Sequence, residues 1–68
     1  MPNKLLGLRK SINKTQADIA KLLDINQATF SKKEKGVSEF KKTEMEKIAS
    51  LFKQYYPSIT LEEIFFNW

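Results

Sequence analysis

Apolar residues recur at helical spacing in five short segments of this chain, and this pattern constrains the fold more than any other feature of the sequence. No stretch shows the sustained alternation of apolar and polar residues that is typical of a half-buried strand. Because the chain has 68 residues, the segments can share only one small core. The sequence therefore predicts an all-α fold, a compact bundle of five short helices in a single domain over residues 1–68. The segments are marked by Leu5, Leu8 and Ile12; by Ile19, Ala20, Leu22 and Leu23; by Phe30; by Met45, Ile48, Ala49, Leu51 and Phe52; and by Leu61, Ile64 and Phe65.

Capping residues and chain breakers predict where these helices begin and end. Three threonines stand three residues before an acid, so that each hydroxyl can cap a helix and each acid lies near the positive end of the helix dipole. Gly36 is expected to end the third helix and Pro57 the fourth, and Phe40 between them is expected to enter the core. The last two helices are therefore placed over residues 43–56 and 60–67. The capping pairs are Thr15 with Asp18, Thr43 with Glu46, and Thr60 with Glu63.

The composition argues against an enzyme. The chain has no cysteine and no histidine, which removes disulfides, thiolate nucleophiles, soft metal sites and the commonest general base. Glu62 and Glu63 point apart on a helix, so they do not form a catalytic carboxylate pair. We therefore expect no catalytic residue, metal, cofactor or small-molecule substrate. No apolar run is long enough for a membrane span or a signal peptide, so we expect a cytoplasmic protein.

The charges are distributed unevenly along the chain. Residues 1–42 carry ten basic and four acidic side chains, whereas residues 43–68 carry two basic and four acidic ones. A basic first part with an acidic second part indicates a polyanionic partner that binds on one side only. The alternative is that the lysines belong to an ordinary solvated surface.

Only three residues, 24–26, separate the second apolar segment from the third. This connection is too short for a hairpin of two long antiparallel helices but long enough for a sharp crossing, which is the geometry of a helix-turn-helix. The sequence therefore predicts a helix-turn-helix over residues 15–35, formed by the second and third helices.

The stretch "TQADIAKLLDINQATFSKKEKG" resembles the helix-turn-helix of the Cro and lambda-repressor family, often called XRE-like. The resemblance extends from about Leu5 to Phe66, and the later part resembles small regulators of phages and mobile elements in Gram-positive bacteria. It implies a lambda-repressor-like DNA-binding domain that regulates transcription, a Cro-like repressor that occupies an operator on double-stranded DNA. The matching positions are Gln16, which opens the motif, Ala20, where a small residue lets the helices cross, and the apolar Ile19, Leu23, Ile25 and Phe30.

Two positions depart from the family pattern. Asp24 stands where the turn usually has glycine, and an aspartate can adopt the left-handed conformation at some cost. Lys33 stands where the family usually has an apolar residue, so its aliphatic stem is expected to lie along the edge of the core.

One acidic side chain of the third helix faces the core. If Phe30 points inward, helical geometry places Glu34 about 40° away from it, and a buried carboxylate needs a partner. Arg9 is the only arginine of the chain, and in the family the corresponding arginine and glutamate commonly pair. We therefore expect a structural ion pair between Arg9 and Glu34; the alternatives for Arg9 are a DNA contact or a free surface charge.

The outward side of the third helix suits the major groove. Asparagine and glutamine can bridge N6 and N7 of adenine, alanine and threonine can touch the methyl group of thymine, and lysine can donate to guanine. An ordinary solvated helix more often carries glutamates that pair with lysines four residues away, and this side has no acid. The alternative is a solvated face without a reading role. The expected base-contacting residues, called here the reading face, are Asn26, Gln27, Ala28, Thr29, Ser31 and Lys32.

Other polar residues are placed to contact the DNA backbone. Gln16 stands in the first turn of the second helix, where unpaired N–H groups and the helix dipole favour a phosphate. Four lysines flank the third helix and can neutralise phosphates without reading sequence. The expected phosphate-contacting residues are Lys14, Gln16, Lys35, Lys41 and Lys42.

The end of the chain is rich in aromatic residues. Either they close a small core, an interpretation that suits Tyr55, Ile64 and Phe65, or they form an interface. The resemblance implies two-fold homodimers that join through this end and bind an inverted-repeat operator. The residues expected at the dimer interface are Tyr56, Phe66 and Trp68. The alternative function is an antitoxin or antirepressor, a protein-interaction module whose main partner binds this aromatic end.

Overall fold

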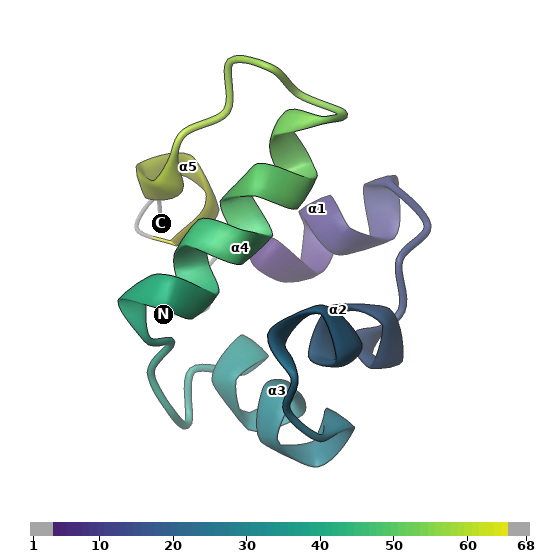
Figure 1. The fold of residues 1–68 in the computed structure, drawn as a ribbon, viewed down its shortest axis with the longest axis vertical. Helices are drawn as coiled ribbons and strands as arrows, with labels where there is room; N and C mark the ends of the chain where they lie inside the picture. The colour runs from purple at the N-terminus through teal and green to yellow at the C-terminus, as the bar shows by residue number, and fades with distance from the viewer. Residues whose placement is uncertain (1–3, 66–68) are drawn as a thin grey trace.

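The computed structural model describes residues 4–65, and this part of the chain forms five α-helices and no strand (Figure 1). The predicted all-α fold is therefore confirmed. The helices are α1 (Leu5–Ser11), α2 (Gln16–Leu23), α3 (Gln27–Glu34), α4 (Lys42–Lys53) and α5 (Leu61–Phe65). None of them is long and apolar enough to cross a membrane.

Every helix contributes a large side chain to one core. Within residues 4–65, six such side chains are fully buried, and burial of each contributes about 1.5–3 kcal/mol to folding. Phe40, in the connection between α3 and α4, enters this core as expected, because its ring centroid lies 6.0 Å from that of Phe30 and 5.2 Å from that of Phe65. The six are Leu5 of α1, Ile19 of α2, Phe30 of α3, Ile48 and Phe52 of α4, and Ile64 of α5.

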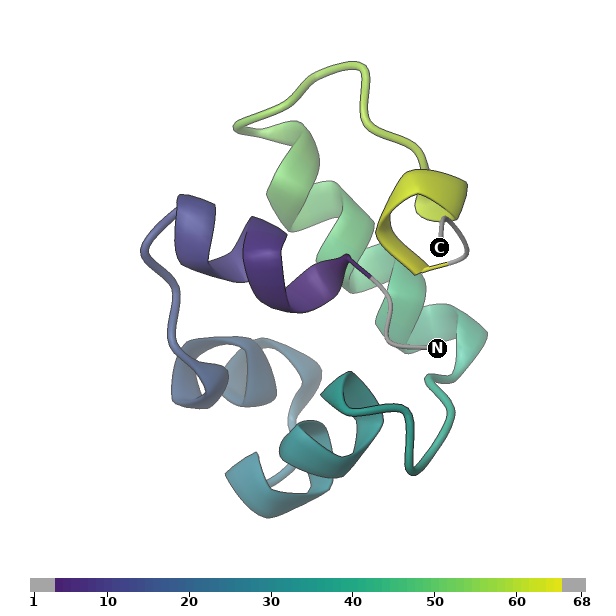
Figure 2. The same ribbon diagram turned by 180° about the vertical axis from the view of Figure 1, so that it is seen from behind.

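α4, the longest helix, packs against α2 on one side and α5 on the other. α2 packs against both α3 and α4, and α5 packs against α4 and α1 (Figures 1 and 2). The backbone N–H of Lys4 donates to the carbonyl of Ile64 at 3.1 Å, which joins the start of α1 to α5. α2 and α3 therefore lie together at one end of the molecule, with α3 at the outside (Figure 1).

The first three helices end in the same way, with a left-handed residue. Asn13, Asp24 and Gly36 have φ angles of 60°, 59° and 86°. After α3, the N–H groups of Gly36 and Val37 donate to the carbonyls of Lys33 and Lys32, which is the Schellman pattern. Asp24 adopts the left-handed conformation expected of it, and this conformation lets the chain turn sharply between α2 and α3.

Two of the three expected capping pairs are present. Thr15 and Asp18 bond reciprocally, since the Thr15 hydroxyl accepts the Asp18 N–H at 3.1 Å and the Asp18 carboxylate accepts the Thr15 N–H at 2.9 Å. Thr60 and Glu63 do the same at the start of α5.

The expected start and end of the fourth helix are both wrong. α4 begins at Lys42, one residue before the expected start, because the Glu44 carboxylate accepts the backbone N–H of Lys41 and makes Lys41 the N-cap. The helix ends at Lys53 instead of residue 56. Its end therefore lies well before Pro57, which was expected to end it. As a result Tyr55 is 47% exposed, so the interpretation of Tyr55 as a core residue is also wrong.

Candidate nucleic-acid interface

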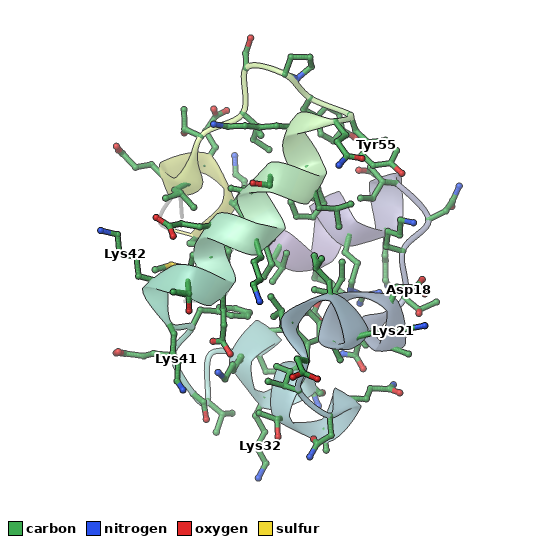
Figure 3. The ribbon with its side chains drawn as sticks, in the orientation of Figure 1. Asp18, Lys21, Lys32, Lys41, Lys42 and Tyr55 are labelled. Atoms are coloured by element: carbon green, nitrogen blue, oxygen red, sulfur yellow. The ribbon has the colours of Figure 1, made fainter. Side chains whose placement is uncertain are left out.

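The side chains of α3 divide sharply between the core and the surface. Phe30, Lys33 and Glu34 are buried, whereas Gln27, Ala28 and Lys32 are exposed. Figure 3 shows Lys32 extending away from the body of the molecule at the end formed by α2 and α3. Of the other residues of the reading face, Thr29 and Ser31 are partly buried and Asn26 is exposed. This side of α3 is therefore a short polar surface without an acid.

Asn26 has a structural task in addition to the expected one. It stands just before α3, and its Oδ1 accepts the backbone N–H of Thr29 at 2.7 Å, which makes it the N-cap of the helix. The amide NH2 of Asn26 remains for an external acceptor. Asn26 was expected to contact a base and its capping role was missed, although an asparagine directly before a helix is a recognised N-cap signal.

A buried ion pair fixes α3 to the rest of the domain. Arg9 Nε donates to Glu34 Oε2 at 2.7 Å, and Arg9 Nη2 donates to Oε1 at 3.3 Å. Arg9 Nη1 donates to the carbonyl of Lys14 at 3.0 Å. The structure therefore brings together the two residues expected to pair, and the interpretation of Arg9 as a free surface charge is wrong because its side chain is 9% exposed.

Gln16 extends this buried network to the reading face. Its Nε2 donates to Glu34 Oε1 at 2.9 Å, and Gln27 Nε2 lies 3.5 Å from Gln16 Oε1. Gln16 is partly buried and contacts Gln27, whereas its phosphate contact stays a prediction. A continuous series of contacts thus runs from Arg9 in α1, through Glu34 and Gln16, to the exposed Gln27.

The four lysines that are expected to contact phosphates differ in exposure and position. Lys35, Lys41 and Lys42 are exposed, whereas Lys14 is partly buried. Figure 3 shows Lys41 on the same lower side of the molecule as Lys32, and Lys42 extending sideways from the first turn of α4. Lys41 is therefore better placed than Lys42 to act together with the reading face.

A second buried ion pair, between Lys33 and Glu44, was missed by sequence reasoning. Lys33 Nζ lies 2.6 Å from Glu44 Oε1, which also accepts the backbone N–H of Lys41 at 2.8 Å. Lys33 is buried instead of lying along the edge of the core. A lysine at a buried position of the motif needs an acidic partner, and this need could have led from Lys33 to the ion pair.

The pKa of Glu44 is lowered by its surroundings. Desolvation raises it, but the hydrogen bonds from Lys33 and from the Lys41 backbone, with the charges of these two lysines, outweigh that effect. A carboxyl whose pKa is lower in the folded than in the unfolded chain stabilises the fold above its unfolded pKa, and this stabilisation is lost as the pH falls through the folded value.

We therefore predict that the free energy of unfolding falls as the pH is lowered below about 4.3, the ordinary pKa of glutamate. For Glu44→Gln the free energy of unfolding should fall less steeply with decreasing pH, because one fewer proton is taken up on unfolding. The two slopes should differ by at most about 1.4 kcal/mol per pH unit. Urea denaturation of both proteins at several pH values measures the difference. Parallel pH profiles would contradict the assignment.

The residues expected at the dimer interface are only partly described. Tyr56 is 38% exposed, and its hydroxyl lies 2.7 Å from Ser11 Oγ, so one edge of the ring is held against α1. Phe66 and Trp68 lie outside the described residues. Figure 3 shows Tyr55 at the end of the molecule opposite to Lys32.

Comparison with known proteins agrees with this geometry. A sequence model of a helix-turn-helix family of the Cro/C1 type matches residues 6–58, which include α2, α3 and α4. Searches of curated proteins and of solved structures gave no significant match. The matched region is most of the chain and contains both the sharp turn at Asp24 and the exposed α3. The chain therefore belongs to the helix-turn-helix family of the Cro/C1 type and is a DNA-binding transcriptional regulator.

Proposed function

We propose that the protein is a Cro-like repressor that binds a specific operator on double-stranded DNA by inserting α3 into the major groove. The observation that carries this proposal is the division of α3: a polar, acid-free face is exposed, while Phe30 and Glu34 on the other face hold the helix rigidly in the domain. Such a helix can present fixed donors and acceptors to base edges. Bound at an operator, the protein would exclude RNA polymerase.

The reading face supplies the base contacts in this proposal. Gln27 is the best placed to read adenine, because its amide group is approached by Gln16, which is itself held by Glu34. Ala28 is exposed and small, so it allows close approach and can touch a thymine methyl group. Lys32 can donate to guanine. Asn26, Thr29 and Ser31 complete the set, Asn26 through its amide NH2.

The lysines beside α3 supply phosphate contacts that carry no sequence information. Lys41 and Lys35 are exposed near α3, and Lys14, Lys42 and Gln16 are assigned the same role. These residues determine affinity and its dependence on salt, whereas the reading face determines which sequence is bound.

The proposal is tested by gel shift with DNA fragments that include the intergenic DNA beside the gene of this protein. We expect one fragment to be retained in the presence of excess competitor DNA at about 0.15 M salt. Equal retention of all fragments would contradict it.

Gln27→Ala should relax sequence preference. We expect the affinity for the preferred operator to fall by about 1–3 kcal/mol, with little change for unrelated duplexes, because a bidentate base contact is lost. Titration of both duplexes at one salt concentration measures the two changes. A loss that is equal for both duplexes would assign Gln27 to the backbone instead.

Lys41→Ala should behave in the opposite way. We expect it to weaken binding to every sequence similarly and to reduce the slope of log affinity against log salt by about one unit, because one phosphate contact is removed. Lys53→Ala, an exposed lysine at the far end of α4, is the matched control and should leave the slope unchanged. An unchanged slope for Lys41→Ala would show that Lys41 does not contact a phosphate.

The proposed active form is a homodimer joined through the aromatic end of the chain, with Tyr56, Phe66 and Trp68 at the interface. Two copies related by a two-fold axis would place their α3 helices about 34 Å apart on an inverted repeat. Analytical ultracentrifugation on the operator duplex should give two chains of 7.9 kDa per site. One chain per site would contradict the dimer, and a stoichiometric foreign partner would favour the antitoxin or antirepressor function.

A further inference from the structure

The buried pair between Lys33 and Glu44 joins α3 to the start of α4 through a single atom. Glu44 Oε1 lies 2.6 Å from Lys33 Nζ and 2.8 Å from the backbone nitrogen of Lys41. The two charged side chains are 10% and 9% exposed. One carboxylate oxygen therefore holds both a side chain of α3 and the backbone of the residue that precedes α4.

Stability alone does not account for this pair. Removing two charges from water is costly, and a well-packed apolar pair of similar volume often stabilises a domain as well or better. The ion pair adds a fixed geometry between the groups that it joins. Apolar side chains can slide over one another, whereas an oxygen that accepts two hydrogen bonds fixes the distance between its donors.

The pair connects two helices that are otherwise joined indirectly. α3 packs on α2, and α4 packs on α2 and α5; within residues 4–65, α3 and α4 are not among the closely packed helix pairs. The neighbouring Glu34 holds the other side of α3 through Arg9 and Gln16, in α1 and α2. Lys33 and Glu44 therefore link α3 directly to the start of α4.

The two ends of this connection carry groups assigned to DNA. Lys32 precedes Lys33 and is exposed, and Lys41, whose backbone is held by Glu44, extends on the same side of the molecule (Figure 3). We propose that Lys33 and Glu44 are positioning residues for DNA binding, which set the distance between the reading face of α3 and Lys41 so that base edges and a phosphate are reached together. This inference rests on the proposed function.

The test uses the full chain and a duplex that the unaltered protein selects from a random-sequence pool, with a scrambled duplex beside it. Lys33→Met/Glu44→Gln removes the ion pair without leaving a buried charge, and its glutamine can still accept the Lys41 N–H. Lys47→Gln/Glu46→Gln is the matched control, because it removes one charge of each sign from exposed positions on α4. Circular dichroism confirms that each protein is folded at the temperature of the titration.

A positioning role predicts that the first variant binds the selected duplex about tenfold more weakly, the loss expected when a base contact is misplaced, while its affinity for the scrambled duplex changes less than twofold. The control should bind both duplexes as the unaltered protein does. A folded variant that keeps its selectivity overturns the inference, and so does an equal loss on both duplexes. Were the double variant unfolded, Glu44→Asp, which keeps the charge and shortens the side chain by one methylene group, would be judged by the same two affinities.

The two proposals fail in different ways. If the unaltered protein selects no duplex, the proposed function is wrong and this inference with it. If it selects a duplex that the ion-pair variants bind with undiminished selectivity, the inference alone is wrong.

Discussion

Glu34→Ala is expected to lower the free energy of unfolding by about 3–5 kcal/mol, because it leaves the Arg9 guanidinium buried without its partner. It also removes the acceptor of the Gln16 side chain. A domain of this length has a total stability of about 3–10 kcal/mol, so much of the population would unfold at ordinary temperature. Urea denaturation followed by circular dichroism measures the change.

Glu39→Ala is the matched control, since Glu39 is an exposed acid in the connection that follows α3. It should change stability by no more than about 0.5 kcal/mol. Adding Arg9→Met to Glu34→Ala should recover part of the loss, because the unpaired charge is then removed. If Glu34→Ala and Glu39→Ala had equal effects, the ion pair would not be what holds α3 in the domain.

Phe30→Ala is the other substitution with a large expected effect. Phe30 is fully buried and its ring contacts Phe40, so removal of the ring should cost about 3–5 kcal/mol through lost burial and the cavity left behind. Because Phe30 is the main apolar anchor of α3, DNA binding should be lost together with the fold. Thermal denaturation and gel shift on the same preparation measure both losses.

Val37→Ala controls for the removal of an apolar side chain. Val37 is 73% exposed and lies just after α3, so its truncation should change stability by no more than about 0.5 kcal/mol. A Phe30→Ala protein as stable as Val37→Ala would contradict the placement of Phe30 in the core.

The sequence predicted those parts of the fold that depend on local patterns. Helical spacing placed Phe30 and Glu34 on the core side of α3, and the short connection around Asp24 predicted the sharp turn. The need of a buried carboxylate for a partner led from Glu34 to Arg9, because the chain has only one arginine. The helix pattern and the turn were carried by neighbouring residues, whereas the pairing of Arg9 with Glu34 was predicted from the single arginine and from the family resemblance.

The features that sequence reasoning missed depend on partners that local patterns do not specify. Thr43 has a hydroxyl and an acid three residues later, yet α4 is capped by Glu44, whose carboxylate is already held in place by Lys33. Lys33 was expected at the edge of the core because its aliphatic stem can lie along apolar surface, and helical periodicity alone does not identify Glu44 as its partner. The exposure of Tyr55 follows from the early end of α4, which also depends on tertiary structure.

The measurement that most directly tests the central claim is selection from a pool of random double-stranded DNA, repeated with Gln27→Ala and with Lys41→Ala. We expect the unaltered protein to enrich one inverted repeat with half-sites about one helical turn apart. With Gln27→Ala, the base preference at particular positions of that repeat should change or weaken. With Lys41→Ala, the same repeat should be enriched with lower yield. Failure of the unaltered protein to enrich any sequence, or an identical repeat from Gln27→Ala, would contradict the claim that α3 reads DNA.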